Sequence, residues 1–497
     1  MEFQFSKTVL DCMKTAAWDM KNEELVQEVR LPDGMEDMSR VLGTWGQILI
    51  RSKEWRPEGM SITGGVTAWV MYTGEDSNSP NWIEVWMPYQ LRWPFMESKS
   101  DGKICVSCSI QSMDARMVSS RKIILRCVIS VAGQGLEHSS VEVFAPAELP
   151  QDVQLLQTTY PVTLVKEAGE KPFALEEELH LPGECADCER LVWCSIQPEI
   201  MDKKIMADKA VFRGSVLVKM LCSCVDGRLH SCDFEIPFSQ YAELDGEYGA
   251  NARMWISPVV TNMEPELGGD GCLRLKAGLI GQYIIYDTHE ISVVEDAYSP
   301  ERLVQPQLQM LNCEALLDMS QQVAKTEQMI DFDGAEIIDV SCFCGQPTVY
   351  SDNGDIEMTG SVQMLGMDSD GHMQADNGPW KHNHTILSDS SCKMMVCTQP
   401  TGKTQISFGP EGDSAKQDIM LDVRCTAMSA IQMVVGMTAE EAAEKNPARP
   451  NLILRKAGDQ SLWEMAKTCG STMDKIRQAN GFTGEPDPET VLLIPVL

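Results

Sequence analysis

The sequence has no stretch approaching the roughly 18 consecutive apolar residues that a membrane-spanning helix needs. It also begins without a basic segment followed by an apolar run, so we expect no secretory signal. Together these absences favour a protein that stays in the cytoplasm where it is made. In that compartment the 18 cysteines are expected to be reduced thiols.

Basic residues are scarce, with 41 Lys and Arg against 73 Asp and Glu, and the formal net charge is −32. Such a field repels nucleic acid and anionic membrane surfaces, and we expect neither as a partner. The composition is 43% apolar and 23% charged, which is ordinary for a globular chain. The 497 residues are enough for about three or four domains.

Motifs of catalysis are missing as well. We find no nucleophile elbow, no phosphate-binding glycine loop, and no paired carboxylates or His-Asp-Ser arrangement at recognisable spacing. The sequence therefore predicts no enzyme and no cofactor. An active site hidden in one folded unit is the alternative, and a pocket with converging acids or histidines would support it.

Two cysteine pairs have zinc-ligand spacing, Cys105-x-x-Cys108 and Cys185-x-x-Cys188. They lie at non-equivalent places, and the first is in a period-two run that points its members to opposite faces of a strand. We therefore favour buried thiols over metal and predict no metal site. The other candidates are interpreted as cysteines packed inside a sheet or as exposed loop histidines: Cys222, Cys224, Cys342, Cys344, His372, His382 and His384.

Internal repeats are present before the tail. The recurring landmarks are Leu31-Pro32 and Leu181-Pro182, then Gly64-Gly65-Val66, Gly214-Ser215-Val216 and Gly360-Ser361-Val362. They recur in the same order at intervals of about 150 residues. We therefore predict three tandem units, 1–150, 151–300 and 301–440, followed by a linker at 441–450.

The dominant period within each unit is two, which is typical of strands. Asp226-Gly227 and Asp370-Gly371 each lie between two β-prone runs and predict hairpins. The fold class is therefore mainly β, with three antiparallel β-sandwich or barrel-like units. Residues 1–26 and 303–317 fit either strand or helix. Seven of the eleven tryptophans lie in the first unit, where a tryptophan-rich core is favoured over an exposed partner-binding patch.

The tail, 451–497, has a different pattern. A strand at 452–454 precedes a capping box, Ser461 with Glu464, that opens a helix. Ser471 with Asp474 predicts a second helix, with Met473, Ile476 and Ala479 on its inner face, that ends at Asn480-Gly481. A strand at 491–495 closes the unit. The expected order is strand, helix, helix, strand, a small α/β domain.

This tail resembles a LysM domain. The resemblance is carried by Gly458-Asp459, Leu462-Trp463, Ala466-Lys467, Asn480-Gly481 and Leu493-Ile494-Pro495. The family usually has one residue between the first two pairs, where this chain has two. The resemblance implies binding of glycans that contain N-acetylglucosamine, usually peptidoglycan. It also implies a groove bordered by two loops, Gly458, Asp459, Gln460, Ser461 and Asn480, Gly481, Phe482, Thr483.

The repeats resemble the SPOCS domain, and 151–300 is the best match. The Leu-Pro turn, the Gly-small-Val strand, the Asp-Gly hairpin and Ile236-Pro237-Phe238-Ser239 carry the likeness. SPOCS units before a LysM tail are the layout of the SipL type of spore-coat morphogenetic protein. The resemblance implies an assembly role in the mother-cell cytoplasm at the forespore surface. It also implies a SpoIVA-like basement-layer ATPase and other coat proteins as partners. The alternative is a peptidoglycan-binding protein of the cell wall or spore cortex.

Overall fold

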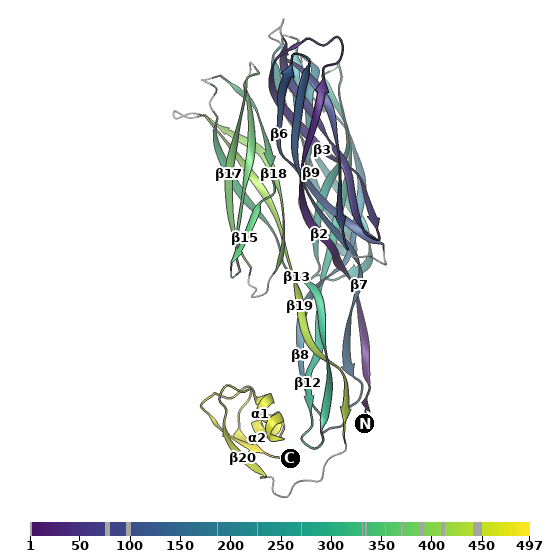
Figure 1. The fold of residues 1–497 in the computed structure, drawn as a ribbon, viewed down its shortest axis with the longest axis vertical. Helices are drawn as coiled ribbons and strands as arrows, with labels where there is room; N and C mark the ends of the chain where they lie inside the picture. The colour runs from purple at the N-terminus through teal and green to yellow at the C-terminus, as the bar shows by residue number, and fades with distance from the viewer. Residues whose placement is uncertain are drawn as a thin grey trace.

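A computed structural model describes residues 2–74, 80–95, 101–185, 187–225, 227–269, 271–330, 332, 335–352, 354–368, 371–386, 392–408, 413–440 and 450–497. The chain is mainly β, which confirms the predicted class. Strands dominate from Glu2 to Ala439, and within the described residues α-helix occurs only in the tail (Figure 1). Among these residues, no helix has both the length and the apolar character that crossing a bilayer requires.

One strand pattern occurs three times. Each set opens and closes with a long strand, and the two pair antiparallel along almost their whole length: β2 (Phe5–Arg30) with β7 (Lys122–Pro146), β8 (Gln154–His180) with β12 (Cys272–Tyr298), and β13 (Val304–Ile330) with β19 (Asp413–Ala439). The two ambiguous segments, 1–26 and 303–317, are therefore mainly strand. Pairing with a distant closing strand is information that local sequence does not contain.

The middle strands of each set form a small antiparallel sheet, and the strand before the closing one pairs with it. In the first set these are β3 (Met38–Arg56), β4 (Gly59–Gly74), β5 (Pro80–Pro94) and β6 (Gly102–Ser119). In the second they are β9 (Cys188–Cys224), β10 (Leu229–Tyr248) and β11 (Arg253–Leu267). In the third they are β14 (Ile337–Cys344), β15 (Thr348–Asp352), β16 (Asp355–Asp368), β17 (Met373–Thr385) and β18 (Lys393–Ser407). The short β1 (Glu2–Phe3) pairs with β19.

Alternating side chains explain why these segments are strands. In β5 every second residue from Ile83 to Trp93 is buried, while the residues between them are exposed. Glycines with positive φ make both predicted hairpin turns: Gly227, with φ 84°, between β9 and β10, and Gly371, with φ 79°, between β16 and β17. Their partners in the predicted turns, Asp226 and Asp370, lie outside the described residues, as does the expected linker apart from Pro450.

Three of the seven tryptophans of the first unit are core residues, as favoured. Trp45, Trp69 and Trp93 are at most 5% exposed. Trp86 is 38% exposed, and the guanidinium of Arg51 lies 5.2 Å from its ring. Trp18, Trp55 and Trp82 are half-buried, so Trp86 alone of these seven tryptophans is exposed.

The three sets share apolar cores. At the end of the long strands, where only the three pairs remain, one cluster draws on all of them (Figure 1). We call these residues the stalk core: Cys12, Val141, Val162, Leu164, Ile291, Val293, Leu311, Cys313, Ala315, Ile431 and Met433. A second shared cluster joins Trp45, Trp193 and Leu365, with one residue from each set. Burial between sets therefore stabilises the body alongside burial within each set.

A buried polar junction also links the sets. Arg424, 3% exposed, donates from Nη1 to Gln134 Oε1 at 3.0 Å and to the Tyr286 hydroxyl at 3.4 Å. Its guanidinium lies 3.9 Å from the ring of Trp255, which donates to Asp422 Oδ2 at 2.5 Å. One residue of the third set thereby contacts both other sets.

Candidate functional site

The tail folds in the predicted order. Strands β20 (Leu452–Lys456) and β21 (Val491–Pro495) pair antiparallel, and α1 (Leu462–Cys469) and α2 (Met473–Asn480) lie between them in the chain. Six of its apolar side chains are fully buried: Leu462, Met465, Ala466, Ile476, Leu492 and Ile494. A compact core of this kind holds the connecting loops in fixed positions.

The first predicted helix start is confirmed, and the second is wrong. The Glu464 amide donates to Ser461 Oγ at 3.2 Å, and the Ser461 amide donates to Glu464 Oε2 at the same distance, a complete capping box. At α2 the cap is Thr472, whose hydroxyl accepts from the Lys475 amide at 3.2 Å. The helix begins one residue later than predicted, and the hydroxyl of Ser471, which is fully buried, caps nothing.

The inner face of α2 also differs from the prediction at one position. Ile476 is buried and Met473 half-buried, as expected, but Ala479 is exposed. Asn480, four residues after Ile476, turns toward β21 instead. Its amide nitrogen donates to the carbonyls of Ile476 and Leu493, both at 2.7 Å, and its Oδ1 accepts from the Leu493 amide at 2.8 Å.

The predicted groove residues divide into two groups. Most are exposed: Gly458, Asp459, Gln460, Ser461, Gly481 and Thr483. Phe482 is half-buried against the tail core. The side chain of Asn480 makes its hydrogen bonds to α2 and β21, so it holds the loop in place. Gly481 ends α2 with φ 69°, as the predicted cap requires.

The structure connects these two loops through Glu485, which the sequence analysis did not identify. Its Oε2 accepts from the Leu462 amide at 2.8 Å, at the start of α1. The amide of Gly458 donates to the carbonyl of Pro488 at 2.9 Å. The segment after Thr483 therefore lies against the first loop. An acid near a helix N-terminus is favourable electrostatically, but its distance in sequence from α1 hides the pairing.

The outer face of α1 docks on the body, a second feature that sequence reasoning missed. Trp463 Nε1 donates to Asp296 Oδ2 at 2.8 Å, and Lys467 Nζ lies 2.7 Å from the same oxygen. The rings of Trp463 and Tyr298 meet edge to face with centroids 4.7 Å apart. The Tyr298 hydroxyl donates to the Ser471 carbonyl at 3.0 Å, and its burial raises the pKa of this phenol to about 12.

We call Asp296, Tyr298, Trp463 and Lys467 the docking contact. Trp463 was expected in the core of the tail, and it is 6% exposed, but β12 supplies part of its cover. The exposed residues of the two groove loops take no part in the docking contact. The tail therefore sits at the end of the second long strand pair with both loops accessible (Figure 1).

A cavity of about 370 Å³ lies where the three sets meet. Its main charged pair joins Lys219 of β9 to Asp339 of β14, with 2.8 Å between Nζ and Oδ1. Hydroxyls of Ser231 and Ser341 also donate to Asp339, at 3.0 and 2.9 Å. Burial opposes the charge of Lys219, but Asp339 and Asp233 outweigh it and raise its pKa. This carboxylate is thus occupied in joining the second and third sets.

The histidines were expected in exposed loops, and for two of them this is wrong. His382 and His384 lie in β17 and are half-buried. His384 Nε2 lies 2.9 Å from Asp318 Oδ2, and His372 Nδ1 lies 2.9 Å from Asp368 Oδ2. His382 and His384 lie two residues apart and so share one face of β17. Because their neighbours in the sequence are polar, this part of the chain did not show the apolar alternation that predicts a strand.

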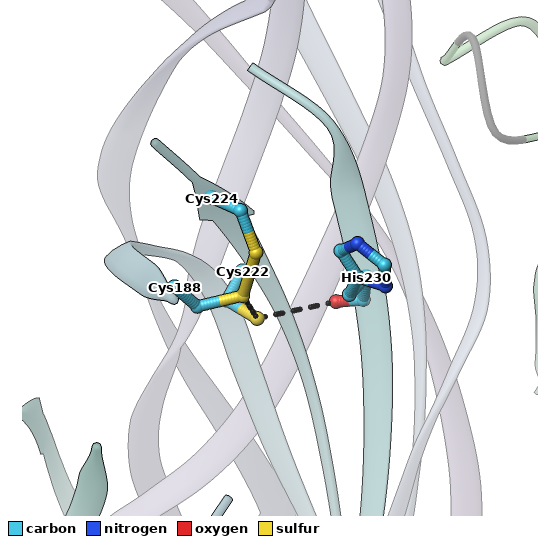
Figure 2. Close-up of a disulfide and its surroundings, with 4 residues drawn as sticks. All are labelled: Cys188, Cys222, Cys224 and His230. Atoms are coloured by element: carbon cyan, nitrogen blue, oxygen red, sulfur yellow. Dashed lines mark hydrogen bonds between the residues drawn. A yellow bond between two sulfur atoms is a disulfide. The ribbon is translucent and has the colours of Figure 1, made fainter. Parts of the chain in front are cut away.

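The cysteines have two kinds of surroundings. Cys105 and Cys108 are thiols whose pKa burial raises to about 11 and about 12. In the second set, by contrast, Cys188 and Cys224 form a disulfide beside Cys222 (Figure 2). The expectation that all cysteines are reduced is wrong for this pair. Cys188 and Cys224 are the first and last residues of β9, so β9 turns back on itself and brings together sulfurs that stand 36 residues apart.

Comparison with known families gives one result. Residues 187–264 match the family model described as SipL, SPOCS domain. This segment covers β9, β10 and most of β11. The chain is thus similar to proteins of the SipL type, and the match indicates a sporulation-associated protein. The tail lies outside the matched residues, and no curated protein matches the chain.

Proposed function

We propose that this chain is a non-enzymatic assembly protein of the bacterial spore coat. In this proposal the three tandem β units offer surfaces for coat proteins. The LysM-like tail binds the basement layer at the forespore surface, where a SpoIVA-like ATPase is the expected partner. The match at 187–264 supports the link to sporulation.

The observation that carries the docking role is the position of the tail. One face of α1 is held by Asp296 and Tyr298, while Asp459, Gln460 and Thr483 face solvent. A strand pair of 26 or 27 residues spans about 85–90 Å at most, since each residue of a strand rises roughly 3.3 Å. The tail at its end suits a protein that binds one layer and presents a distant surface to another.

The test is the position of a fluorescent fusion of the full chain in sporulating cells. We expect a shell around the forespore that is lost when Asp459 and Gln460 are both replaced by alanine. Lys475→Ala, an exposed change on α2, is the matched control and should leave the shell intact. Pull-down of the basement-layer ATPase by the same three chains identifies the partner.

Two results would overturn the proposal. Fluorescence at the vegetative wall or septum, with saturable retention on purified peptidoglycan, would establish the glycan-binding alternative. A forespore shell that persists in the double loop variant would show that the loops do not make the attachment.

A further inference from the structure

Five cysteines of the second set gather at one end of its strands. Cys185 ends a single 3-10 turn (Gly183–Cys185), and Cys188 is the first residue of β9. Cys222 and Cys224 lie in the last residues of β9, which turns back on itself so that Cys224 meets Cys188. Cys232 lies on β10. Antiparallel pairing places Cys222 opposite His230 and Cys232 opposite Met220. Cys222 and Cys232 are therefore diagonal neighbours on one sheet face.

The sulfur atoms converge. Those of Cys185, Cys188 and Cys222 all lie within 4.8 Å of one another. The sulfurs of Cys188 and Cys222 are 2.7 Å apart, and Cys232 lies beside Cys222 on the neighbouring strand. In a tetrahedral zinc site the Zn–S distance of about 2.3 Å sets neighbouring sulfurs roughly 3.8 Å apart. Three sulfurs of the second set therefore lie close enough together to bind one metal ion, and Cys232, on the strand beside Cys222, is the candidate for a fourth ligand.

Burial distinguishes four of the five. Cys185, Cys188, Cys222 and Cys232 are at most 4% exposed, whereas Cys224 is half-buried at the end of its strand. A closed structural zinc site has four protein ligands and no open position for water or substrate. Four buried sulfurs with no carboxylate or imidazole among them form a donor set that favours a soft metal.

The first set provides an internal comparison. The Cys185 amide donates to the Pro182 carbonyl at 2.8 Å, and 150 residues earlier the Met35 amide donates to the Pro32 carbonyl at 3.3 Å. Met38 and Tyr72 lie the same 150 residues before Cys188 and Cys222, and both are core residues of the first set. Strand pairing puts Ile83, also buried, in the position of Cys232.

Met35, Met38, Tyr72 and Ile83 occupy these positions in the first set, so ordinary core side chains close this end there without cysteine. Three convergent sulfurs in the second set, with a fourth buried cysteine on the neighbouring strand, are more than packing at this position requires. A shared ligand explains their convergence, because each sulfur of such a site points to one centre.

We propose that the reduced chain binds one zinc ion through Cys185, Cys188, Cys222 and Cys232. Binding forms four Zn–S bonds and releases the protons of four thiols. Zinc and the Cys188–Cys224 bond compete for the sulfur of Cys188 (Figure 2). A dithiol reductant opens that bond: Cys188 and Cys224 each take up a proton and an electron, and the dithiol closes to its own disulfide. The zinc then fastens the 3-10 turn to both β9 and β10.

The test begins with the full wild-type chain, purified with dithiol reductant from zinc-supplemented medium and analysed by elemental mass spectrometry. We expect about one zinc per chain. Replacement of zinc by Co²⁺ should give the visible absorption of a tetrahedral thiolate site. Cys224→Ser removes the disulfide partner and should keep the metal. Cys222→Ser should lose it, and Cys194→Ser, a fully buried thiol of the same core, is the matched control.

Several outcomes would overturn the assignment. Reduced wild-type chain that carries less than about a tenth of an equivalent of zinc and takes up no Co²⁺ would refute it without relying on any variant. Loss of zinc in Cys224→Ser, with the fold intact by circular dichroism, would mean that Cys224 is itself a zinc ligand, which contradicts the proposed set of four. Stoichiometric iron with inorganic sulfide would mean an iron–sulfur cluster instead.

Discussion

Removal of the Asp296 carboxylate should release the tail from the body. Asp296→Ala deletes the hydrogen bond from Trp463, a bond to a charged group that is worth about 1.5–3 kcal/mol. It also deletes the ion pair with Lys467, which is partly exposed and adds at most about 1 kcal/mol. Because these contributions are not additive, we expect a loss of about 2–3 kcal/mol in the free energy of docking.

That loss corresponds to an opening equilibrium about 30- to 150-fold more favourable. Hydrogen exchange of the full chain, followed by mass spectrometry, measures it. Amides of α1 and of the β12 end should exchange faster by this factor, while the stalk core keeps its protection. Asp296→Asn keeps an oxygen that accepts from Trp463 and should give a smaller effect. Glu290→Ala, exposed on the same strand, is the matched control.

Unchanged exchange of α1 in Asp296→Ala would refute the reasoning. It would mean that the ring contact between Trp463 and Tyr298, with its surrounding apolar burial, holds the tail alone. Faster exchange throughout the body would point instead to general destabilisation, which the docking contact does not predict.

Three further predictions concern the tail, the junction and pH. Asn480→Ala removes three hydrogen bonds and should cost the tail about 2–3 kcal/mol, seen as faster exchange in α2 and β21, with Gln478→Ala as exposed control. Arg424→Met removes the stronger of two positive charges, Arg424 and Lys203, that act on buried Asp422, and should cost the body about 3–5 kcal/mol in chemical unfolding. Burial raises the pKa of Asp152, but hydrogen bonds from Ser299 and Arg302 outweigh it, so the net pKa lies below its ordinary value. Its stabilisation is therefore complete above pH about 4 and lost as pH falls through the lowered folded value; Asp152→Asn should flatten the melting temperature between pH 5 and 2.

Clear results would contradict each of these. Equal exchange in Asn480→Ala and Gln478→Ala would remove the bridging role of the amide. An unfolding midpoint unchanged by Arg424→Met would mean that the junction between sets is not a source of stability. A wild-type melting curve as flat in acid as that of Asp152→Asn would exclude the proposed contribution of this carboxylate.

The sequence alone was sufficient for properties that depend on neighbouring residues. Period two predicts strands, Asp-Gly predicts hairpins and Ser461 with Glu464 predicts a helix start, because each signal is read by backbone atoms a few residues away. The order of the tail and the mainly β class follow from such signals. The second helix start was one residue off: Ser471 with Asp474 has the spacing of a cap, but the adjacent Thr472 makes the capping hydrogen bond while Ser471 is buried.

Only the tertiary structure decided which distant residues meet. Asp296 and Trp463 are 167 residues apart, and nothing near either one predicts the contact. The same is true of the sulfurs on the 3-10 turn, β9 and β10, where Cys185-x-x-Cys188 was visible but its partners were not. Long antiparallel strands pair ends of the chain that lie far apart in sequence. Local periodicity fixes which face of a strand is buried, while the partner strand fixes what that face contacts.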